Sequence, residues 1–178
     1  MNLTTSQQSI HANILQSIEH KQAKYLACTR LLKQHYSKSL PTPLVYHSPF
    51  QLLVAAILCV QSEESVVNRV TVELFEKYPD PQAIASADNR TLNDIIRPTK
   101  FHRRKAKHLQ LASEMLLLEY DNKIPDDLVE LTKLPGISRR SAYLILSELY
   151  EKTEGIIVDS RVWRVADRMG LARGHSAE

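Results

Sequence analysis

The sequence has little cysteine, and this shortage excludes several kinds of metalloprotein. Its two cysteines, Cys28 and Cys59, stand far apart, form no CxxC pair and join no Cys/His cluster with metal-ligand spacing. Neither a zinc site nor an iron–sulfur cluster can be assembled from these ligands, so the sequence predicts no metal and no cofactor. We expect both cysteines to be reduced, packed thiols.

Long hydrophobic runs are also missing. Residues 1–20 contain neither a continuous apolar stretch nor a small-residue cleavage site, and no later window is as long as a membrane span. We therefore expect a cytoplasmic protein. A chain of 178 residues with 43% hydrophobic content has enough apolar side chains for one core, or for two small lobes that share a cleft.

The net charge of +3 indicates an anionic partner only weakly, but the basic residues are clustered. Of the 23 Lys and Arg residues, 13 fall in two segments of the chain, Arg97, Lys100, Arg103, Arg104, Lys105 and Lys107 in the first and Lys133, Arg139, Arg140, Lys152, Arg161, Arg164 and Arg168 in the second. Two basic patches of this kind favour nucleic acid as the partner.

The spacing of apolar residues predicts an all-α protein. The expected helices cover residues 7–36, 49–60, 63–77, 82–85, 90–96, 101–119, 125–133 and 138–150, with a last one from 159 or 160 to 169. The one strand-like run, 155–158, is too short and solitary to make a sheet. Residues 52–58 are apolar on every side of their helix, which places that helix at the centre of the molecule.

Leu134, Pro135, Gly136 and Ile137 separate two of these helices and predict a hairpin that binds a phosphate. Gly136 permits a positive φ, and Ser138 is suited to cap the second helix. The backbone N–H groups at that helix N-terminus attract a phosphate oxygen. Arg139 adds positive charge beside it. An ordinary turn between two packed helices is the alternative interpretation.

Asp159 gives this hairpin a chemical context. It follows an apolar run, Ile156 to Val158, and precedes a basic helix. With these pieces in place, the chain resembles the endonuclease III branch of the helix-hairpin-helix DNA glycosylases. The resemblance runs from about Ser48 to Met169. It rests on residues 48–50, 58–61, 101 with 105–106, 134–137 and 158–165.

The resemblance implies two helical lobes with a DNA cleft between them, into which a damaged nucleotide is flipped. Gln61 matches the residue that fills the gap left in the duplex, and Phe101 matches an apolar wedge against the opposite strand. Asp159 matches the essential carboxylate, which stabilises positive charge on the sugar or activates a nucleophile. The alternatives are a solvated helix end for Gln61, a core aromatic for Phe101 and a plain N-cap for Asp159.

Four positions depart from the family pattern. Arg140 stands where bifunctional members have the lysine that attacks the sugar, and a guanidinium is not usable for imine formation. Ser138 and Lys100 replace glycines, and Tyr143 replaces a small polar residue. These changes predict base excision without strand cleavage, with Arg140 holding DNA or the sugar. They also leave open a distorted pocket.

The resemblance divides the chain into residues 1–44, an N-terminal helical part of the second lobe, residues 45–171, the glycosylase core, and residues 172–178, a frayed tail. The family continues with further helices and a four-cysteine iron–sulfur loop. We therefore expect a truncated second lobe. The apolar stripe of the first helix is then covered by a folded-back segment or by a partner chain.

The predicted function is base-excision repair: a DNA N-glycosylase acting on duplex DNA with damaged bases, oxidised pyrimidines in the first place, through Asp159 and Arg140. The alternative is a catalytically silent remnant that binds DNA through Pro135, Gly136, Ile137, Ser138 and Arg139 alone.

Overall fold

The computed structural model describes residues 5–36, 42–152, 155, 158 and 160–171. Over these residues it contains helices and no strand, which confirms the all-α prediction. The helices are α1 (Thr5–Tyr36), α2 (Pro49–Cys59), α3 (Glu64–Lys77), α4 (Pro81–Ala85), α5 (Asn89–Ile95), α6 (His102–Glu119), α7 (Leu128–Lys133), α8 (Arg139–Tyr150) and α9 (Ser160–Arg168). They form two compact units, one of residues 41–157 and one of residues 1–40 with 158–178.

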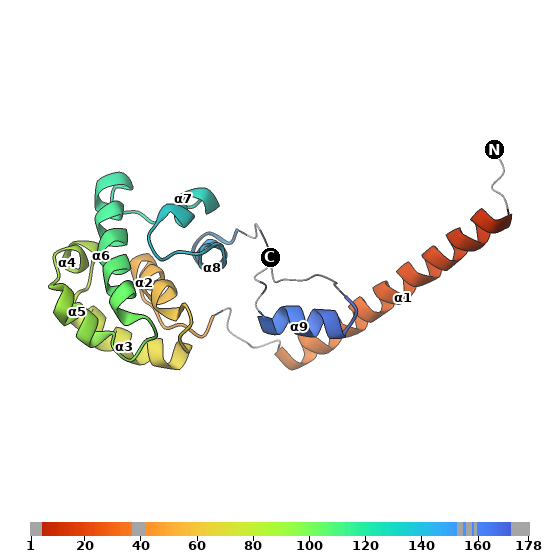
Figure 1. Cartoon of the computed structure of the whole chain (residues 1–178), viewed down its shortest axis with the longest axis horizontal. Coiled ribbons are helices and arrows are strands. Elements are labelled where there is room, and N and C mark those ends of the chain that lie inside the picture. The colour runs from red at the N-terminus through yellow and green to blue at the C-terminus, as the bar shows by residue number, and fades with distance from the viewer. Residues whose placement is uncertain (1–4, 37–41, 153–154, 156–157, 159, 172–178) are drawn as a thin grey trace. The chain divides into compact units, whose positions relative to one another are not determined.

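Helix α2 forms the centre of the 41–157 unit, as its uniformly apolar sequence predicts. Residues 52–58 are all buried, and the helix packs against α3, α6 and α8 (Figure 1). Its start is fixed by Ser48, whose Oγ accepts a hydrogen bond from the Gln51 N–H at 3.2 Å. The Gln51 side chain in turn accepts from the His47 N–H at 2.8 Å. Reciprocal bonds between side chains and backbone N–H groups therefore fix the start of the central helix.

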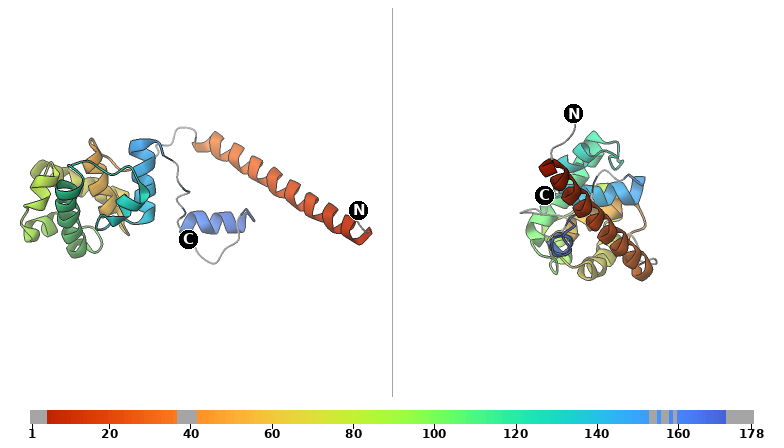
Figure 2. Two further views of the ribbon diagram at one scale, coloured as in Figure 1. Left: turned by 90° about the horizontal axis from the view of Figure 1, so that it is seen from above. Right: turned by 90° about the vertical axis from the view of Figure 1, so that its right-hand side faces the viewer.

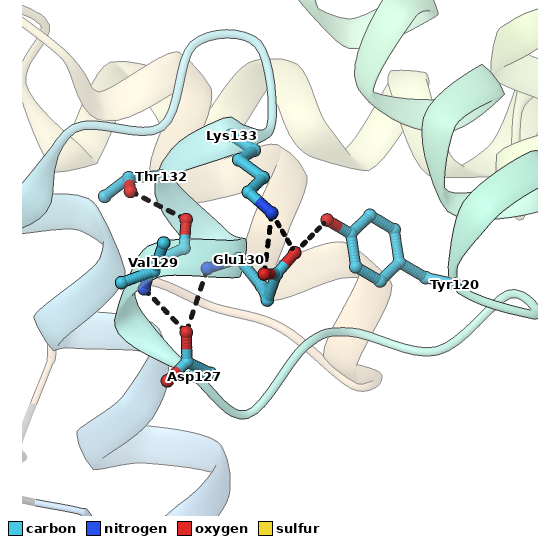
Figure 3. A network of polar contacts seen from close by, with 6 residues as sticks. All are labelled: Tyr120, Asp127, Val129, Glu130, Thr132 and Lys133. Atoms are coloured by element: carbon cyan, nitrogen blue, oxygen red, sulfur yellow. Dashed lines mark hydrogen bonds and ion pairs between the residues drawn. The ribbon is translucent and has the colours of Figure 1, made fainter.

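Helix α7, the first helix of the hairpin, begins at Leu128 and not at Pro125 as the sequence suggests. The reason is the cap: one oxygen of Asp127 accepts hydrogen bonds from the N–H groups of both Val129 and Glu130. Glu130 then joins α7 to the end of α6, because its carboxylate binds Lys133 and accepts from the Tyr120 hydroxyl at 2.9 Å (Figure 3).

The other unit contains α1 and α9. Helix α1 runs unbroken from Thr5 to Tyr36 (Figure 2), where the sequence predicts a helix over residues 7–36. Several of its apolar side chains are exposed in the described part of the chain: Tyr25, Leu26, Leu31 and Leu32. The expected strand-like run at 155–158 and the tail at 172–178 lie wholly or partly outside the described residues.

Candidate DNA-binding and catalytic site

The hairpin turn between α7 and α8 has the geometry that its sequence predicts. Gly136 takes φ +89°, a region that L-residues rarely adopt, and the Ile137 N–H closes the turn on the Leu134 carbonyl at 3.1 Å. A Cβ on Gly136 would lie 3.0 Å from His108 Nδ1 and 3.1 Å from Ile57 Cγ2. The turn is therefore seated directly on the central helix α2 and on α6.

Helix α8 starts immediately after this turn, and Ser138 caps it. The Ser138 Oγ accepts from the Ser141 N–H at 3.2 Å, and the Ser138 backbone is extended, with φ −87°. A serine is thus accommodated here without the strain that the loss of a glycine could cause. The N–H groups of Arg139 and Arg140 lie in the first turn, where no intrahelical acceptor exists and the helix dipole is positive.

Arg140 is exposed and belongs to the same unit as the hairpin. Its charge reaches the thiol of Cys59, at the end of α2. Burial raises the pKa of Cys59 and Glu64 adds to the rise, whereas Arg140 and Lys105 oppose it. The end of α2 and the start of α8 therefore share one electrostatic environment.

Gln61 and Phe101 are both exposed and both have left-handed backbones, with φ +55° and +58°. Phe101 is 52% exposed, so the alternative of a core aromatic is wrong. The guanidinium carbon of Arg104 lies 5.2 Å from the centroid of the Phe101 ring. Their roles as gap-filling residue and wedge stay predictions. What the structure adds is that both project from loops at the end of α2 and the start of α6.

Lys105, which the sequence places in the first basic patch, is buried. It is only 3% exposed, and its ammonium donates to the Leu58 carbonyl at 2.6 Å and to Ser62 Oγ at 2.8 Å. The spacing contains the signal that could have found it. Lys105 stands four residues before Leu109 and shares the buried stripe of α6 with Leu109, Ala112 and Leu116.

Asp159 lies outside the described residues, and its described neighbours, Val158 and Ser160, belong to the other unit. Its role as the essential carboxylate accordingly stays a prediction. Tyr143, the other unusual residue near the expected pocket, packs closely on Gly155: a Cβ there would lie 2.7 Å from the Tyr143 ring.

Within the described residues, no group of three or more His, Cys, Asp or Glu side chains is arranged to hold a metal ion. None of the helices in the same residues has both the length and the hydropathy needed to cross a membrane.

A comparison with protein families identifies the family of this chain. The model of the HhH-GPD superfamily of base excision DNA repair proteins matches residues 54–178. The chain belongs to this family. The HhH-GPD match confirms the DNA repair function predicted from the sequence, and it includes the hairpin, Arg140 and Asp159.

Relatives of the HhH-GPD chain include endonuclease III of Synechocystis, 35% identical over 162 residues, which cover 91% of this chain and 74% of the relative. Endonuclease III of Bacillus subtilis is 38% identical over 130 residues, 73% of this chain and 59% of the relative. Endonuclease III of Rickettsia felis is 37% identical over 146 residues, which cover 80% of this chain and 68% of the relative. The chain thus resembles endonuclease III over most of its own length and spans roughly 59% to 74% of these relatives.

Solved structures support the same assignment. A non-covalent endonuclease III–DNA complex and a trapped endonuclease III–DNA covalent intermediate each match with a TM-score of 0.82 and 34% identity over 88% of this chain. The matched regions make up 72% and 73% of these two endonuclease III chains. A thermostable thymine-DNA glycosylase, 15% identical with a TM-score of 0.72 over 82% of this chain and 68% of that one, shares the fold. The chain is a DNA glycosylase of base-excision repair with the predicted all-α fold.

Proposed function

We propose that this glycosylase removes oxidised pyrimidines from duplex DNA and leaves the resulting abasic site uncut. One observation carries the second half of the proposal. An arginine, Arg140, occupies the first turn of α8, at the position where the resemblance expects the lysine of bifunctional members. A guanidinium remains protonated and forms no imine with the sugar, so the covalent route to strand cleavage is closed.

The proposed chemistry is hydrolysis. The N-glycosidic bond breaks, the base leaves with the bonding electron pair and takes up a proton, and the hydroxyl of a water molecule adds to C1′. We assign Asp159 to the positive charge that develops on the sugar, or to the activation of that water. Arg140 contributes fixed positive charge toward the phosphates next to the sugar, which supports binding and orientation rather than bond formation.

Binding is assigned to the rest of the site. The first-turn N–H groups at Arg139 and Arg140 are proposed to hold one phosphate, with the Pro135–Gly136 turn fixing the helix end. Gln61 and Phe101 are proposed to replace the extruded nucleotide and to press on the opposite strand. Hairpin contacts of this type carry no sequence information, as expected for an enzyme that must scan any sequence.

The test is excision from duplexes that carry an oxidised pyrimidine, with each reaction divided and one half heated in alkali to break abasic sites. Cleavage that appears only after alkali supports the proposal. Cleavage in both halves contradicts the assignment of Arg140. No cleavage in either half, from folded protein that binds DNA, favours the catalytically silent remnant instead.

Two variants refine this test. Asp159→Asn is expected to abolish excision with duplex binding nearly unchanged; equal loss of both would show a structural cap. Arg140→Lys returns an amine to the first turn of α8, and we expect it to gain a borohydride-trapped adduct with abasic DNA. Arg139→Lys, one position earlier on the same turn, is the matched control and should give no adduct.

The finer partner assignment concerns α1. Leu26, Leu31 and Leu32 are each more than half exposed, and we propose that a partner chain covers this helix. Light scattering coupled to size-exclusion chromatography tests it, because Leu26→Glu should dissociate a homodimer and leave a monomer unaffected. We also propose that the protein acts in the cytoplasm, in association with the DNA that it repairs.

A further inference from the structure

Lys105 is a buried cation that the proposed chemistry does not use. Its neighbours Arg103, Arg104 and Lys107 are exposed, whereas Lys105 is 3% exposed. Removing an ammonium group from water is unfavourable unless hydrogen bonds compensate, and an apolar side chain of similar volume would fill the same space at lower cost. The use of lysine at this position therefore calls for an explanation other than packing.

The bonds of the ammonium group suggest one. Lys105 Nζ donates to the Leu58 carbonyl at 2.6 Å, in the last turn of α2, and to Ser62 Oγ at 2.8 Å. Ser62 Oγ also accepts from the backbone N–H of Lys100 at 3.0 Å. One buried ammonium thus ties the loop after α2 to the loop before α6, although the two are about 40 residues apart in the chain.

Each of these loops carries one of the two proposed DNA-inserting residues. Gln61 stands between Leu58 and Ser62, and Phe101 stands between Lys100 and Lys105. Both are non-glycine residues at positive φ, a conformation that L side chains rarely adopt and that persists only where the surroundings enforce it. The bonds of Lys105 and Ser62 act directly on the residues that flank them.

We propose that Lys105 is a positioning residue for base extrusion, whose ammonium group, with Ser62, holds Gln61 and Phe101 in one fixed arrangement. The two residues then enter the duplex together, one into the gap left by the flipped nucleotide and the other against the opposite strand. This inference rests on the proposed function, because it takes the roles of Gln61 and Phe101 from there. Burial lowers the pKa of Lys105 to about 8, with Cys59 partly opposing the shift. The energetic cost of keeping the group charged is consistent with a role outside packing.

The experiment uses the full chain and a duplex with a tetrahydrofuran abasic analogue opposite 2-aminopurine, whose fluorescence rises when it is unstacked. The variants are Lys105→Met, which keeps the volume and loses both bonds, and Ser62→Ala, which keeps the Lys105–Leu58 bond. Lys77→Met, which removes one exposed cation from α3, is the matched control. Single-turnover excision from a second duplex that carries an oxidised pyrimidine, duplex affinity and thermal stability are measured on all of them.

For Lys105→Met we expect the fluorescence rise at saturating protein to be largely lost and excision to slow by about tenfold or more, with affinity for undamaged duplex within about twofold. Ser62→Ala should show the same pattern with a smaller loss, and Lys77→Met should match the wild type. Hydrogen exchange of the Lys100 amide should accelerate in Ser62→Ala and Lys105→Met, which tests the bridge without DNA.

Either of two results with Lys105→Met would overturn the inference. One is a folded Lys105→Met with the fluorescence rise and excision rate of the wild type; the other is a loss of duplex affinity and stability in proportion to activity, which indicates packing alone. If Lys105→Met does not fold, Ser62→Ala decides by the same criteria. A wild type that unstacks 2-aminopurine but excises nothing refutes the proposed function and leaves this inference standing. A wild type that does not unstack the probe refutes the inference.

Discussion

Replacing Gly136 by alanine tests how far the stability of the hairpin depends on its close packing against α2 and α6. Two effects add. A side chain at φ +89° costs about 1–2 kcal/mol, because Cβ crowds the following peptide group. The new Cβ also approaches the Ile57 and His108 side chains at 3.1 Å and 3.0 Å, and relieving such overpacking typically costs about 1–3 kcal/mol. We expect Gly136→Ala to lower the free energy of unfolding by about 2–5 kcal/mol.

Gly170 offers the matched control. It also has a positive φ, +65°, but nothing lies within 4 Å of a Cβ built on it. Gly170→Ala should therefore show only the conformational part, about 1–2 kcal/mol. Urea unfolding followed by circular dichroism gives both values, and fluorescence anisotropy gives duplex affinity, which should fall only for Gly136→Ala because its turn must shift. Equal losses of stability in the two variants would show that the contacts of Gly136 with Ile57 and His108 contribute nothing, and would refute the prediction.

Two further predictions concern stability. Ser48→Ala removes the cap of α2 and should cost about 1 kcal/mol in urea unfolding, against less than about 0.5 kcal/mol for the exposed Ser147→Ala; equal effects would contradict the capping role. The second concerns Lys105, whose pKa in the folded state, about 8, is below its ordinary value of 10.5. Between those pH values the unfolded chain therefore binds more protons, and stability rises with pH. From pH 7 to pH 10 the Lys105 protein should gain about 1–3 kcal/mol relative to Lys105→Met, both in a Cys59→Ala background because Lys105 and Cys59 shift each other's pKa; a constant difference would contradict the pKa shift.

The sequence predicts the helices well where a cap and an apolar stripe agree. Ser48 starts the central helix, and the uniformly apolar residues 52–58 identify its burial. Helix α7 starts at Leu128, whereas the sequence predicts a start at Pro125. Pro125, Asp126 and Asp127 are all residue types that occur at helix starts, and only the side-chain hydrogen bonds show which of them caps the helix. Asp127 caps two N–H groups, whereas Asp126 instead binds Lys152. No local pattern contains that long-range ion pair.

In the candidate site, the positions of backbone strain also differ from those that the sequence indicates. Ser138 and Lys100 replace glycines of the family pattern, so the sequence points to these two positions as the places where a Cβ could distort the site. Neither belongs to the described residues with positive φ; Ser138 is extended, with φ −87°. The left-handed backbones are instead at Gln61 and Phe101, for which no glycine or asparagine gives a warning. Their conformation is imposed from outside, by bonds such as those of Lys105 and Ser62 with partners 38 to 47 residues away. Strain of this kind follows from tertiary contacts, so the sequence points to the residues proposed to enter the DNA but not to the contacts that hold their backbones in place.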